Sequence, residues 1–594
     1  MSIQQHLHHS THQALLQLFQ VQEGSIPFQV NETKPEFTGD YTIVLFSLLK
    51  PLKLAPNVIG DALGTYLVTN HEQYVAYNII KGFLNITVSD TYYTQLLELN
   101  HADICYGKKA QNGLTVMVEY SSPNTNKPLH LGHLRNNFLG YSIAEIYKAN
   151  GYNVVTTCIV NDRGIHICKS MVAWQQYANG ATPSTTGIKG DHLVGQYYVQ
   201  YNTVYKQQVA QLLAQGLSQK EAEEQAPILQ AAKHMLLQWE QGHPAVMQLW
   251  NSMNSWVYQG FDATYRIIGS QFNKTYYESN TYLLGKTAIK LGLQQHVFYT
   301  KDDGSIWINL TADGLDEKLV QRKDGTSVYI TQDIGLAQQK YEEYHMHKSI
   351  YVIGNEQDYH MAVLKLICQK LALPYANDIE HLSYGMVELP SGKMKSREGT
   401  VVDADDIITE MIAKSKTETA AHGKTDHFTQ EELTELYTTI GLGATKFYLL
   451  RVDPKKKMVF NPEESIEFIG YTGPFVQYTH ARIKSILRKN EWQPTNLPST
   501  STSTELLPLE KKLLYQLEQY ETILEQAAKD YNPSHIAMYC FNIAQSFNSL
   551  YAAHQVTNAE TEEKKQLRLK LCSFTATVIS SAMQLLGIAV PERM

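Results

Sequence analysis

The stretch from Leu114 to His133 reads LTVMVEYSSPNTNKPLHLGH, and it decides the fold. It opens with an apolar, β-branched run that predicts a strand and continues through a Ser, Pro and Asn loop. A helix follows His130, with apolar side chains three and four residues apart until Asn150-Gly151. The run Val154 to Val160 predicts the next strand. This strand–helix–strand order is typical of a parallel, doubly wound sheet.

Further strands are predicted downstream, separated from the first two by a long helical segment. The Gln- and Tyr-rich residues 171–275 show no strand alternation and predict a helical insertion. Strand-like runs resume at 304–310, 328–331 and 350–353, and 381–387 reads as a strand of a hairpin. The predicted fold class is therefore α/β, with a Rossmann-like parallel-sheet domain that carries a helical insertion.

The chain is predicted to divide into four units. The predicted boundaries are 1–108 for an N-terminal α+β domain and 109–400 for the parallel-sheet domain, with its insertion at about 171–275. A connecting helical segment at 401–454 leads to an all-α bundle at 455–594. In the bundle, one helix starts at Asn532-Pro533 and another ends at Gly587, while 494–505 reads as a surface loop. A chain of 594 residues is too long for a single core.

Composition excludes several classes of protein. With 43% hydrophobic and 18% charged residues, the chain is not a disordered one. The first residues lack the basic and apolar regions of a secretory signal, and no apolar run approaches the roughly 18 residues of a membrane span. Six cysteines without a CxxC pair indicate free thiols in a reducing compartment, so we expect a cytoplasmic protein without a structural metal. The net charge of −8 means that a nucleic-acid partner would need a local basic face.

The motif His130-Leu131-Gly132-His133 lies where a strand gives way to a helix. A helix N-terminus offers unpaired N–H groups and a positive dipole end, which suit a triphosphate. The two imidazoles can donate to phosphate oxygens during displacement at the α-phosphate. On its own this pattern is weak, because two histidines near a helix start are usually incidental.

A second motif, Gly392-Lys393-Met394-Lys395-Ser396-Arg397-Glu398-Gly399, follows much later in the chain. A glycine-flanked loop with several cations can close over a pyrophosphate leaving group. By itself it reads as an exposed basic loop. The two motifs together resemble the paired signatures of the class I aminoacyl-tRNA synthetases.

Five ordered segments extend this resemblance over nearly the whole chain, to the arginyl-tRNA synthetase family. They are 118–137 (VEYSSPNTNKPLHLGHLRNN), 329–333 (YITQD), 354–357 (GNEQ), 471–482 (YTGPFVQYTHAR) and 585–594 (LLGIAVPERM). The resemblance implies ATP, bound with Mg²⁺, as the energy source. The residues that it implies for ATP are His130, Gly132, His133, Met386, Val387, Lys393 and Met394.

The loop departs from the family pattern. Ser396 stands where the second lysine is usual, and members that lack this lysine commonly carry one just before the HxGH motif. Lys127 occupies that place, so we predict that it supplies the missing charge from the other side of the ATP. The predicted catalytic residues are therefore Lys127, His130, His133, Lys393 and Arg397.

The chemistry of the arginine side chain indicates which residues its binding site needs. A guanidinium is planar and permanently charged, so its receptor needs carboxylates in fork geometry. Glu119 and Asp333 both lie at or just beyond the C-terminal end of a predicted strand, where open α/β sheets bind ligands. By resemblance, the residues that face L-arginine are Glu119, Asn124, His130, Tyr329, Asp333 and Gln357. The turn Asn161-Asp162-Arg163-Gly164 resembles a family turn in which an aromatic residue takes the place of Arg163.

The tail and the N-terminal unit are the predicted RNA-binding parts. Aromatic residues interleaved with basic ones suit unstacked bases such as those of an anticodon loop. The resemblance implies an anticodon-binding bundle for the tRNA for arginine, and an N-terminal domain that contacts the tRNA elbow. The predicted tRNA-binding residues are Tyr471, Gln477, Tyr478, His480, Arg482 and Met594. The insertion is predicted to be structural or to contact tRNA.

The implied activity is that of an arginine–tRNA ligase, which forms arginyl-adenylate and transfers arginine to the terminal adenosine of the tRNA. We expect a monomer. One alternative is a class I synthetase for another amino acid, which the pairing of Glu119 with Asp333 disfavours. Another is a catalytically silent tRNA-binding paralogue, which Ser396 keeps open. A small-molecule nucleotidyltransferase would leave the long helical tail unexplained.

Overall fold

The computed structural model describes residues 2–594 except 35, 327, 391–401, 423–427 and 494–504. Its centre is a sheet of five parallel strands in the order β12-β11-β5-β6-β7. The strands are β5 (Thr115–Glu119), β6 (Asn153–Val160), β7 (Lys274–Tyr277), β11 (Lys348–Gly354) and β12 (Ile379–Tyr384). Chain order thus runs from β5 outward to β7 on one side and then from β11 to β12 on the other. This confirms the predicted doubly wound sheet and makes the β5–β11 boundary its switch point.

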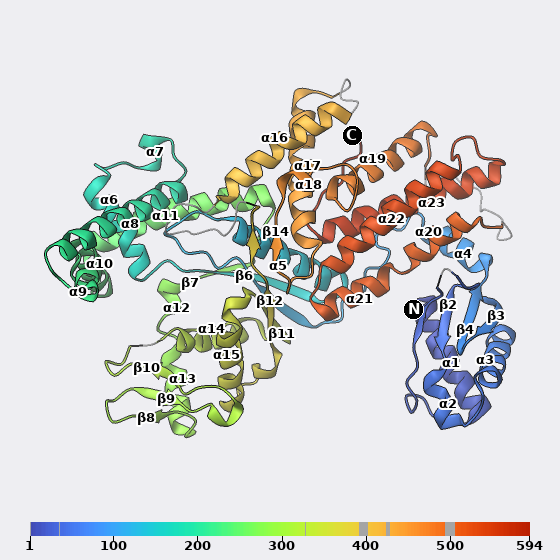
Figure 1. Ribbon diagram of the computed structural model, residues 1–594, viewed down its shortest axis with the longest axis horizontal. Helices are drawn as coiled ribbons and strands as arrows, with labels where there is room; N and C mark the ends of the chain where they lie inside the picture. The colour runs from blue at the N-terminus through green and yellow to red at the C-terminus, as the bar shows by residue number, and fades with distance from the viewer. Residues whose placement is uncertain (1, 35, 327, 391–401, 423–427, 494–504) are drawn as a thin grey trace.

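The helix α5 (Leu131–Ala149) crosses from β5 to β6, and its boundaries agree with the sequence prediction. Two insertions interrupt the remaining strands. Between β6 and β7 lie α6 (Ile165–Tyr177), α7 (Pro183–Thr186), α8 (Gly190–Ala214), α9 (Gln219–Gln225), α10 (Pro227–Glu240) and α11 (Pro244–Ile268). These helices extend to the left of the sheet in Figure 1. They match the predicted helical insertion in character.

The second insertion, between β7 and β11, was not predicted as a unit. Its elements are α12 (Glu278–Thr281), α13 (Gly285–Gln294), β8 (Tyr299–Thr300), β9 (Ile306–Ile308), β10 (Lys318–Gln321) and α14 (Tyr329–Tyr344). The three strands form a small antiparallel sheet with its own buried cluster. In Figure 1 this unit lies below the main sheet, next to α15 (Asp358–Lys370).

Two strand predictions were wrong. Residues 328–331 were predicted as a strand but form the cap and first turn of α14. Their short β-branched run hides a helical period, because Ile330, Ile334 and Ala337 are buried on one face. Asp333 therefore lies on a helix and not at a strand end. Residues 381–387 form no hairpin: β12 is a parallel edge strand, and β13 (Val387–Glu388) pairs in parallel with β14 (Met458–Val459).

The N-terminal unit is an antiparallel sheet in the order β1-β2-β4-β3, covered by helices. Its elements are α1 (Ile3–Phe19), β1 (Val30–Glu32), β2 (Tyr41–Val44), α2 (Phe46–Leu52), α3 (Pro56–Asn70), β3 (Tyr74–Ile80), β4 (Phe83–Val88) and α4 (Asp90–Asn100). It docks under the C-terminal bundle, where Lys570 donates to Glu98 at 2.7 Å and Ile3 N–H donates to Glu518 at 2.7 Å. The α+β character agrees with the prediction.

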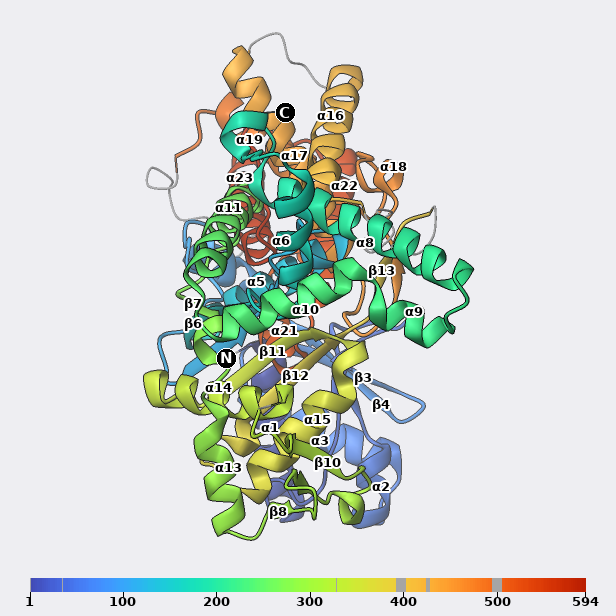
Figure 2. The same cartoon turned by 90° about the vertical axis from the view of Figure 1, so that its left-hand side faces the viewer.

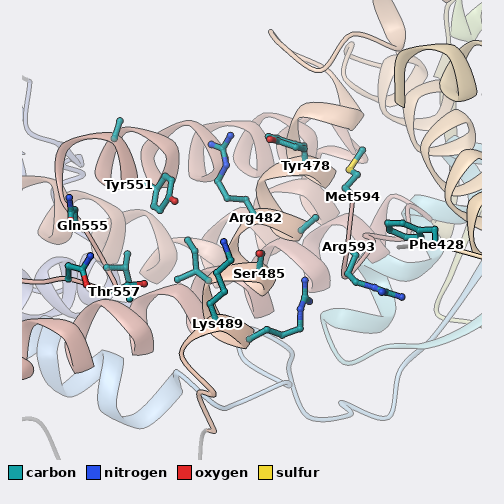
Figure 3. A pocket seen from close by; sticks show the side chains of 16 residues that line it. Phe428, Tyr478, Arg482, Ser485, Lys489, Tyr551, Gln555, Thr557, Arg593 and Met594 are labelled. Atoms are coloured by element: carbon teal, nitrogen blue, oxygen red, sulfur yellow. The ribbon is translucent and has the colours of Figure 1, made fainter. Parts of the chain in front are cut away.

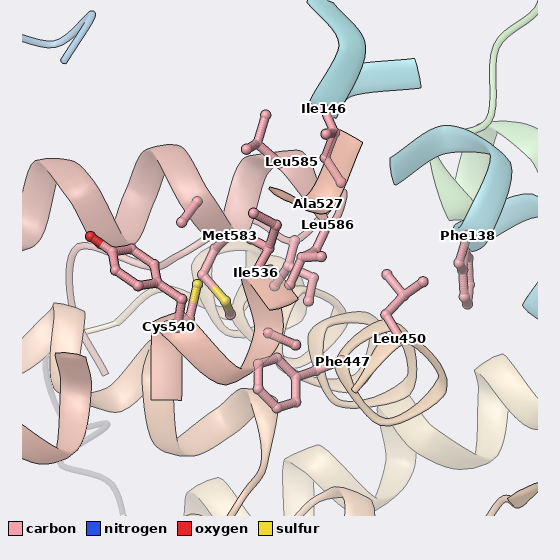
Figure 4. Close-up of a cluster of buried hydrophobic side chains, with 14 of the residues drawn as sticks. Phe138, Ile146, Phe447, Leu450, Ala527, Ile536, Cys540, Met583, Leu585 and Leu586 are labelled. Atoms are coloured by element: carbon pink, nitrogen blue, oxygen red, sulfur yellow. The ribbon is translucent and has the colours of Figure 1, made fainter. Parts of the chain in front are cut away.

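In its described residues the C-terminal part is helical apart from the short strand β14. It comprises α16 (Ala404–His422), α17 (Gln430–Leu450), α18 (Pro462–Ser465), α19 (Gly473–Lys489), α20 (Pro508–Glu518), α21 (Tyr520–Asp530), α22 (Ser534–Ala553) and α23 (Glu562–Leu585). Figure 2 shows these helices stacked above the sheet domain. Figure 4 shows the shared core, in which Phe138 and Ile146 of α5 lie beside Leu450 and Leu585 of the bundle. The predicted loop at 494–505 falls almost entirely outside the described residues.

No helix in the described part of the chain combines the length and the apolarity that a membrane crossing needs.

Arg135 on α5 connects the sheet domain to the bundle. Its side chain is buried, and its guanidinium donates to the carbonyls of Gly385 at 2.8 Å and Met386 at 3.3 Å. The other nitrogen donates to Pro454 at 3.1 Å and Lys456 at 2.9 Å. Burial lowers the pKa of Arg135 to about 10, so the side chain still carries its charge at neutral pH. One cation thereby fixes the segment that carries Met386 and Val387.

Replacing Arg135 with Met should leave the carbonyls of Gly385 and Lys456 without a donor, whereas those of Pro454 and Met386 keep the N–H groups of Gly385 and Met458. An acceptor without a partner costs about 1–3 kcal/mol, so two of them should lower the free energy of unfolding by about 2 kcal/mol or more. Urea unfolding followed by circular dichroism measures this loss. Arg266→Gln, on the exposed side of α11, is the matched control. An Arg135→Met midpoint equal to that of the control would contradict the assigned role.

Candidate active site and RNA-binding face

The turn that follows β5 has an unusual backbone. Ser121 and Ser122 adopt positive φ angles of 83° and 37°, which L-residues rarely take. Asn136 on α5 accepts the Ser121 N–H at 2.5 Å and donates to the Val352 carbonyl on β11 at 2.7 Å. Asn137 donates to the Ser121 hydroxyl at 3.1 Å. Helix α5 thus holds a strained turn at the switch point, and such strain is concentrated at functional sites.

The histidines of the HxGH motif cap α5. His130 is the N-cap residue, and its Nδ1 accepts the Gly132 N–H at 3.1 Å. The Nδ1 of His133 accepts the His130 N–H, also at 3.1 Å. A neutral imidazole whose Nδ1 accepts must carry its proton on Nε2. Both rings therefore keep an Nε2–H that can donate to an anion at the helix end.

The same environment keeps the two imidazoles neutral. Burial, followed by the nearby Lys127 charge, lowers the pKa of His130 to about 3. Burial also holds the pKa of His133 well below its usual value, with the His130 and Lys127 charges adding to the effect. Gly132 suits this packing, because a Cβ there would lie 3.0 Å from the His130 ring, which is closer than an ordinary contact. Its predicted place among the ATP-binding residues stays a prediction.

Lys127 and His130 line a cavity of about 430 Å³ with Asp403 and residues of α8. Met386 is partly exposed, and Val387 is buried. Lys393, Met394, Ser396 and Arg397 of the second motif lie outside the described residues, so their predicted roles stay predictions.

A second cavity, of about 490 Å³, opens at the carboxyl ends of β5 and β11. It brings together five of the six residues predicted to face arginine, namely Glu119, Asn124, Tyr329, Asp333 and Gln357. The sixth, His130, lines the neighbouring 430 Å³ cavity instead. Residues far apart in the sequence thus meet at the switch point, where open α/β sheets bind ligands.

Glu119 differs from the expectation of an open carboxylate. It is 4% exposed and forms an ion pair with Lys340 on α14, whose side chain is fully buried. The Lys340 ammonium also lies 4.7 Å from the centroid of the Tyr351 ring. Because the pair is buried, each charge needs the other. Glu119 therefore brings no uncompensated negative charge to the cavity.

Asp333 and Tyr329 lie one turn apart on α14, so both side chains can face the cavity. The Asp333 carboxylate is partly exposed, and its Oδ2 lies 2.6 Å from the His360 Nε2. In the described structure no Lys or Arg side chain forms an ion pair with Asp333.

Glu278 is a cavity residue that the sequence reasoning missed. It is the first residue of α12 and lines the cavity with Asp333. Burial raises its pKa to about 7, the Arg163 charge opposes the rise, and the Asp162 and Asp333 charges add to it. Such a perturbed carboxyl group in a cavity indicates a functional role. Its sequence context, KTYYESN, gives no signal, because its place depends on the folding of the second insertion.

One group of side chains has the spacing of a metal site. The donor atoms of Asp191, His192 and Asp405 lie within 4.8 Å of one another. Lys189 already places its ammonium 3.1 Å from Asp191 and 2.6 Å from Asp405. In the parts of the chain that can be described, this group is therefore an ion-pair network between the insertion and the first turn of α16.

The bundle carries a cavity of about 1050 Å³ with a basic and aromatic lining (Figure 3). Arg482 lies over the Tyr478 ring at 4.8 Å and the Tyr551 ring at 5.7 Å. The other basic residues that line it are Arg488, Lys489 and Arg593, and Met594 lies at its edge. Three of the six predicted tRNA contacts, Tyr478, Arg482 and Met594, therefore share this cavity.

The other three predicted contacts lie elsewhere. Gln477 is buried and donates to the carbonyls of Thr439 at 3.1 Å and Ala589 at 2.8 Å. His480 is buried, with its Nδ1 3.0 Å from the Pro591 carbonyl. Tyr471 packs against Phe447 and Phe541. Through these carbonyls Gln477 and His480 hold the C-terminal segment. His480 also lines a separate cavity of about 870 Å³ with Lys484 and Arg488, and the RNA contacts of Tyr471, Gln477 and His480 stay predictions.

Comparison with known proteins agrees with this architecture. The family model described as tRNA synthetases class I (R), catalytic domain, matches residues 95–461. The model described as DALR anticodon binding domain matches residues 476–594. Among solved structures, the Thermus thermophilus arginyl-tRNA synthetase has a TM-score of 0.81 at 24% identity, covering 100% of both chains. The Plasmodium falciparum arginyl-tRNA synthetase has a TM-score of 0.78 at 18% identity, covering 100% of this chain and 99% of that one. At these identities the two structures establish the fold.

Curated relatives are closer in sequence. The arginine–tRNA ligase of Flavobacterium psychrophilum is 50% identical over 607 residues, which cover 100% of both proteins. That of Bacteroides fragilis is 50% identical over 569 residues, with 95% of each covered. With the switch-point cavity, the capped HxGH helix and these full-length matches, the chain belongs to the arginyl-tRNA synthetase family, the class I ATP-dependent arginine–tRNA ligases.

Proposed function

We propose that the 490 Å³ cavity binds L-arginine, with Asp333 and Glu278 as the carboxylates that accept from its guanidinium. The observation that carries this proposal is the difference between the three carboxylates of the cavity. Lys340 neutralises Glu119, whereas in the described structure neither Asp333 nor Glu278 forms an ion pair with a Lys or Arg side chain. Two such acids suit a planar cation with five donors.

The remaining predicted residues have supporting roles in this proposal. Tyr329 and Asn124 line the same cavity and can orient the substrate, while Gln357 and Asn124 are placed to hold its α-amino and carboxylate end. Glu119, paired with Lys340, forms the neutral polar floor. Lysine or citrulline would leave acceptors of this site without donors, which supports strong selection for arginine.

ATP, bound as its Mg²⁺ complex, is proposed to lie along the N-terminus of α5. The Nε2–H groups of His130 and His133 donate to phosphate oxygens there, and Lys127 adds positive charge. The arginine carboxylate then attacks the α-phosphorus in line, and pyrophosphate leaves. Lys393 and Arg397 are proposed to contact that pyrophosphate. In the second step the 2′-hydroxyl of the terminal adenosine attacks the acyl carbon, and AMP leaves.

The tRNA is proposed to bind across the bundle, with anticodon bases stacked in the cavity that Tyr478, Tyr551 and Arg482 line. The N-terminal domain is proposed to contact the tRNA elbow. We further propose a monomeric, cytoplasmic enzyme, whose free cysteines suit a reducing compartment.

Lys127→Ala should lower the rate of aminoacylation by on the order of 100-fold, a typical effect of losing one donor to transition-state charge. The reason is that Ser396 leaves the second motif one cation short of the family pattern. Aminoacylation at saturating arginine and tRNA measures the rate. Lys220→Ala on the exposed face of α9 serves as the control. A change under about threefold would remove Lys127 from the chemistry.

Arginine use should depend on pH through Glu278. Only its ionised form carries the charge that pairs with a guanidinium, and burial raises its pKa to about 7. We therefore expect kcat/KM for arginine to fall as the pH falls below about 7, approaching a tenfold loss per pH unit. Glu278→Gln should raise the KM for arginine and should abolish the fall of kcat/KM on the acidic side of the pH profile. An unchanged pH profile in Glu278→Gln would refute the assignment.

A further inference from the structure

The turn Asn161-Asp162-Arg163-Gly164 joins β6 to α6 at the wall of the arginine cavity, and Arg163 lines that cavity. A permanent cation beside a site for a cationic substrate should weaken binding of that substrate. The contacts of the Arg163 guanidinium show where its charge is directed.

The guanidinium of Arg163 is turned toward the insertion. Its central carbon lies 3.9 Å from the centroid of the Tyr282 ring and 5.1 Å from that of the Trp239 ring. One of its nitrogens lies 3.2 Å from the Glu240 carboxylate, and its side chain is 12% exposed. Trp239 and Glu240 end α10, whereas Tyr282 directly follows α12. The Arg163 side chain therefore contacts both inserted segments, whose Trp239 and Tyr282 rings also lie 6.2 Å apart.

The preceding residue, Asp162, fixes the start of α12. Its carboxylate accepts from the Ser279 N–H at 2.8 Å and from the Ser279 hydroxyl at 2.7 Å. Tyr258 on α11 donates to the same carboxylate at 2.9 Å. Ser279 directly follows Glu278, so this turn determines where the Glu278 backbone lies.

We infer that Arg163 is a positioning residue for the amino-acid site, which joins α10 of the insertion to α12 and thereby sets the place of Glu278. The inference rests on the proposed role of Glu278 in binding arginine. Stacking between Tyr282 and Trp239 directs the guanidinium away from the substrate. Its positive charge still favours the ionised form of the neighbouring Glu278.

The insertion is consequently part of the arginine site without touching the substrate. A shift of the C-terminal end of α10 acts on Trp239 and Glu240, and through Arg163 on the segment that carries Glu278. Whatever ligand displaces α10 should therefore alter the affinity for arginine more than the affinity for ATP.

Steady-state aminoacylation by the full-length enzyme tests this. Arg163→Gln should raise the KM for arginine about tenfold, with the KM for ATP changed by less than about twofold, as expected for loss of one desolvated cation–π and charge contact. Arg163→Lys keeps the charge and should recover part of this loss. Glu240→Gln, outside the cavity, should raise the arginine KM by about threefold, the scale of a partly exposed ion pair. Arg266→Gln is the matched arginine control.

The pH profile separates positioning from general destabilisation. Removing the Arg163 charge should move the acidic limb of kcat/KM for arginine to higher pH, because Glu278 then ionises less readily. Arg163→Lys should leave the limb in place. A limb that stays in place in a folded Arg163→Gln enzyme would overturn the inference.

Combining Arg163→Gln with Glu278→Gln completes the test. If Arg163 acts through Glu278, the double variant should have nearly the same arginine KM as Glu278→Gln alone. Fully additive effects would overturn the inference while leaving the proposed function intact. An arginine KM unaffected by Glu278→Gln would instead refute the proposed binding role of Glu278.

Discussion

The site depends on the amide of Asn136, which ties three parts of the sheet domain together at the switch point. Its oxygen accepts the Ser121 N–H at 2.5 Å, and its nitrogen donates to the Val352 carbonyl at 2.7 Å. The end of β5, the body of α5 and the end of β11 are thereby fixed to one another. The strained Ser121–Ser122 turn persists because this amide and Asn137 hold it. That turn begins the connection from β5 to α5, which carries Lys127 and ends at His130.

Charge is the second constraint on the molecule. The cavity that we propose for arginine would hold a permanent cation, yet it contains Lys340 and Arg163 among its own side chains. Both have partners in the protein: Lys340 pairs with the buried Glu119, and Arg163 with Glu240 and two aromatic rings. In the proposed site Asp333 and Glu278 are left to accept from the substrate. At the neighbouring helix end, burial keeps His130 and His133 neutral, so in the proposed ATP site both would act as oriented donors beside the charge of Lys127.

Sequence reasoning predicted the first strand–helix–strand unit closely, because its periodicity and its HxGH motif are local properties of the chain. It wrongly predicted a strand at 328–331, the start of α14. This run of four β-branched and aromatic residues is too short to distinguish a strand from a helix turn. Glu278 and Lys340 were missed for a different reason. Their roles arise only when α12 packs against β7 and α14, and when Lys340 of α14 meets Glu119 of β5, and no local sequence pattern indicates that packing. Gln477 and His480 lie in a helix that matches a family motif. The carbonyls of Ala589 and Pro591 that they contact belong to the C-terminal segment, so the sequence of the helix does not indicate these contacts.

The central claim is that two carboxylates without Lys or Arg partners hold the guanidinium while Glu119 stays paired with Lys340. A crystal structure of the full-length enzyme with bound L-arginine tests it most directly. The account predicts guanidinium nitrogens within hydrogen-bond distance of Asp333 and Glu278, about 2.7–2.9 Å for such charge-assisted contacts, with the Glu119–Lys340 pair intact. A guanidinium bound to Glu119, with Lys340 displaced and Glu278 turned away, would contradict it.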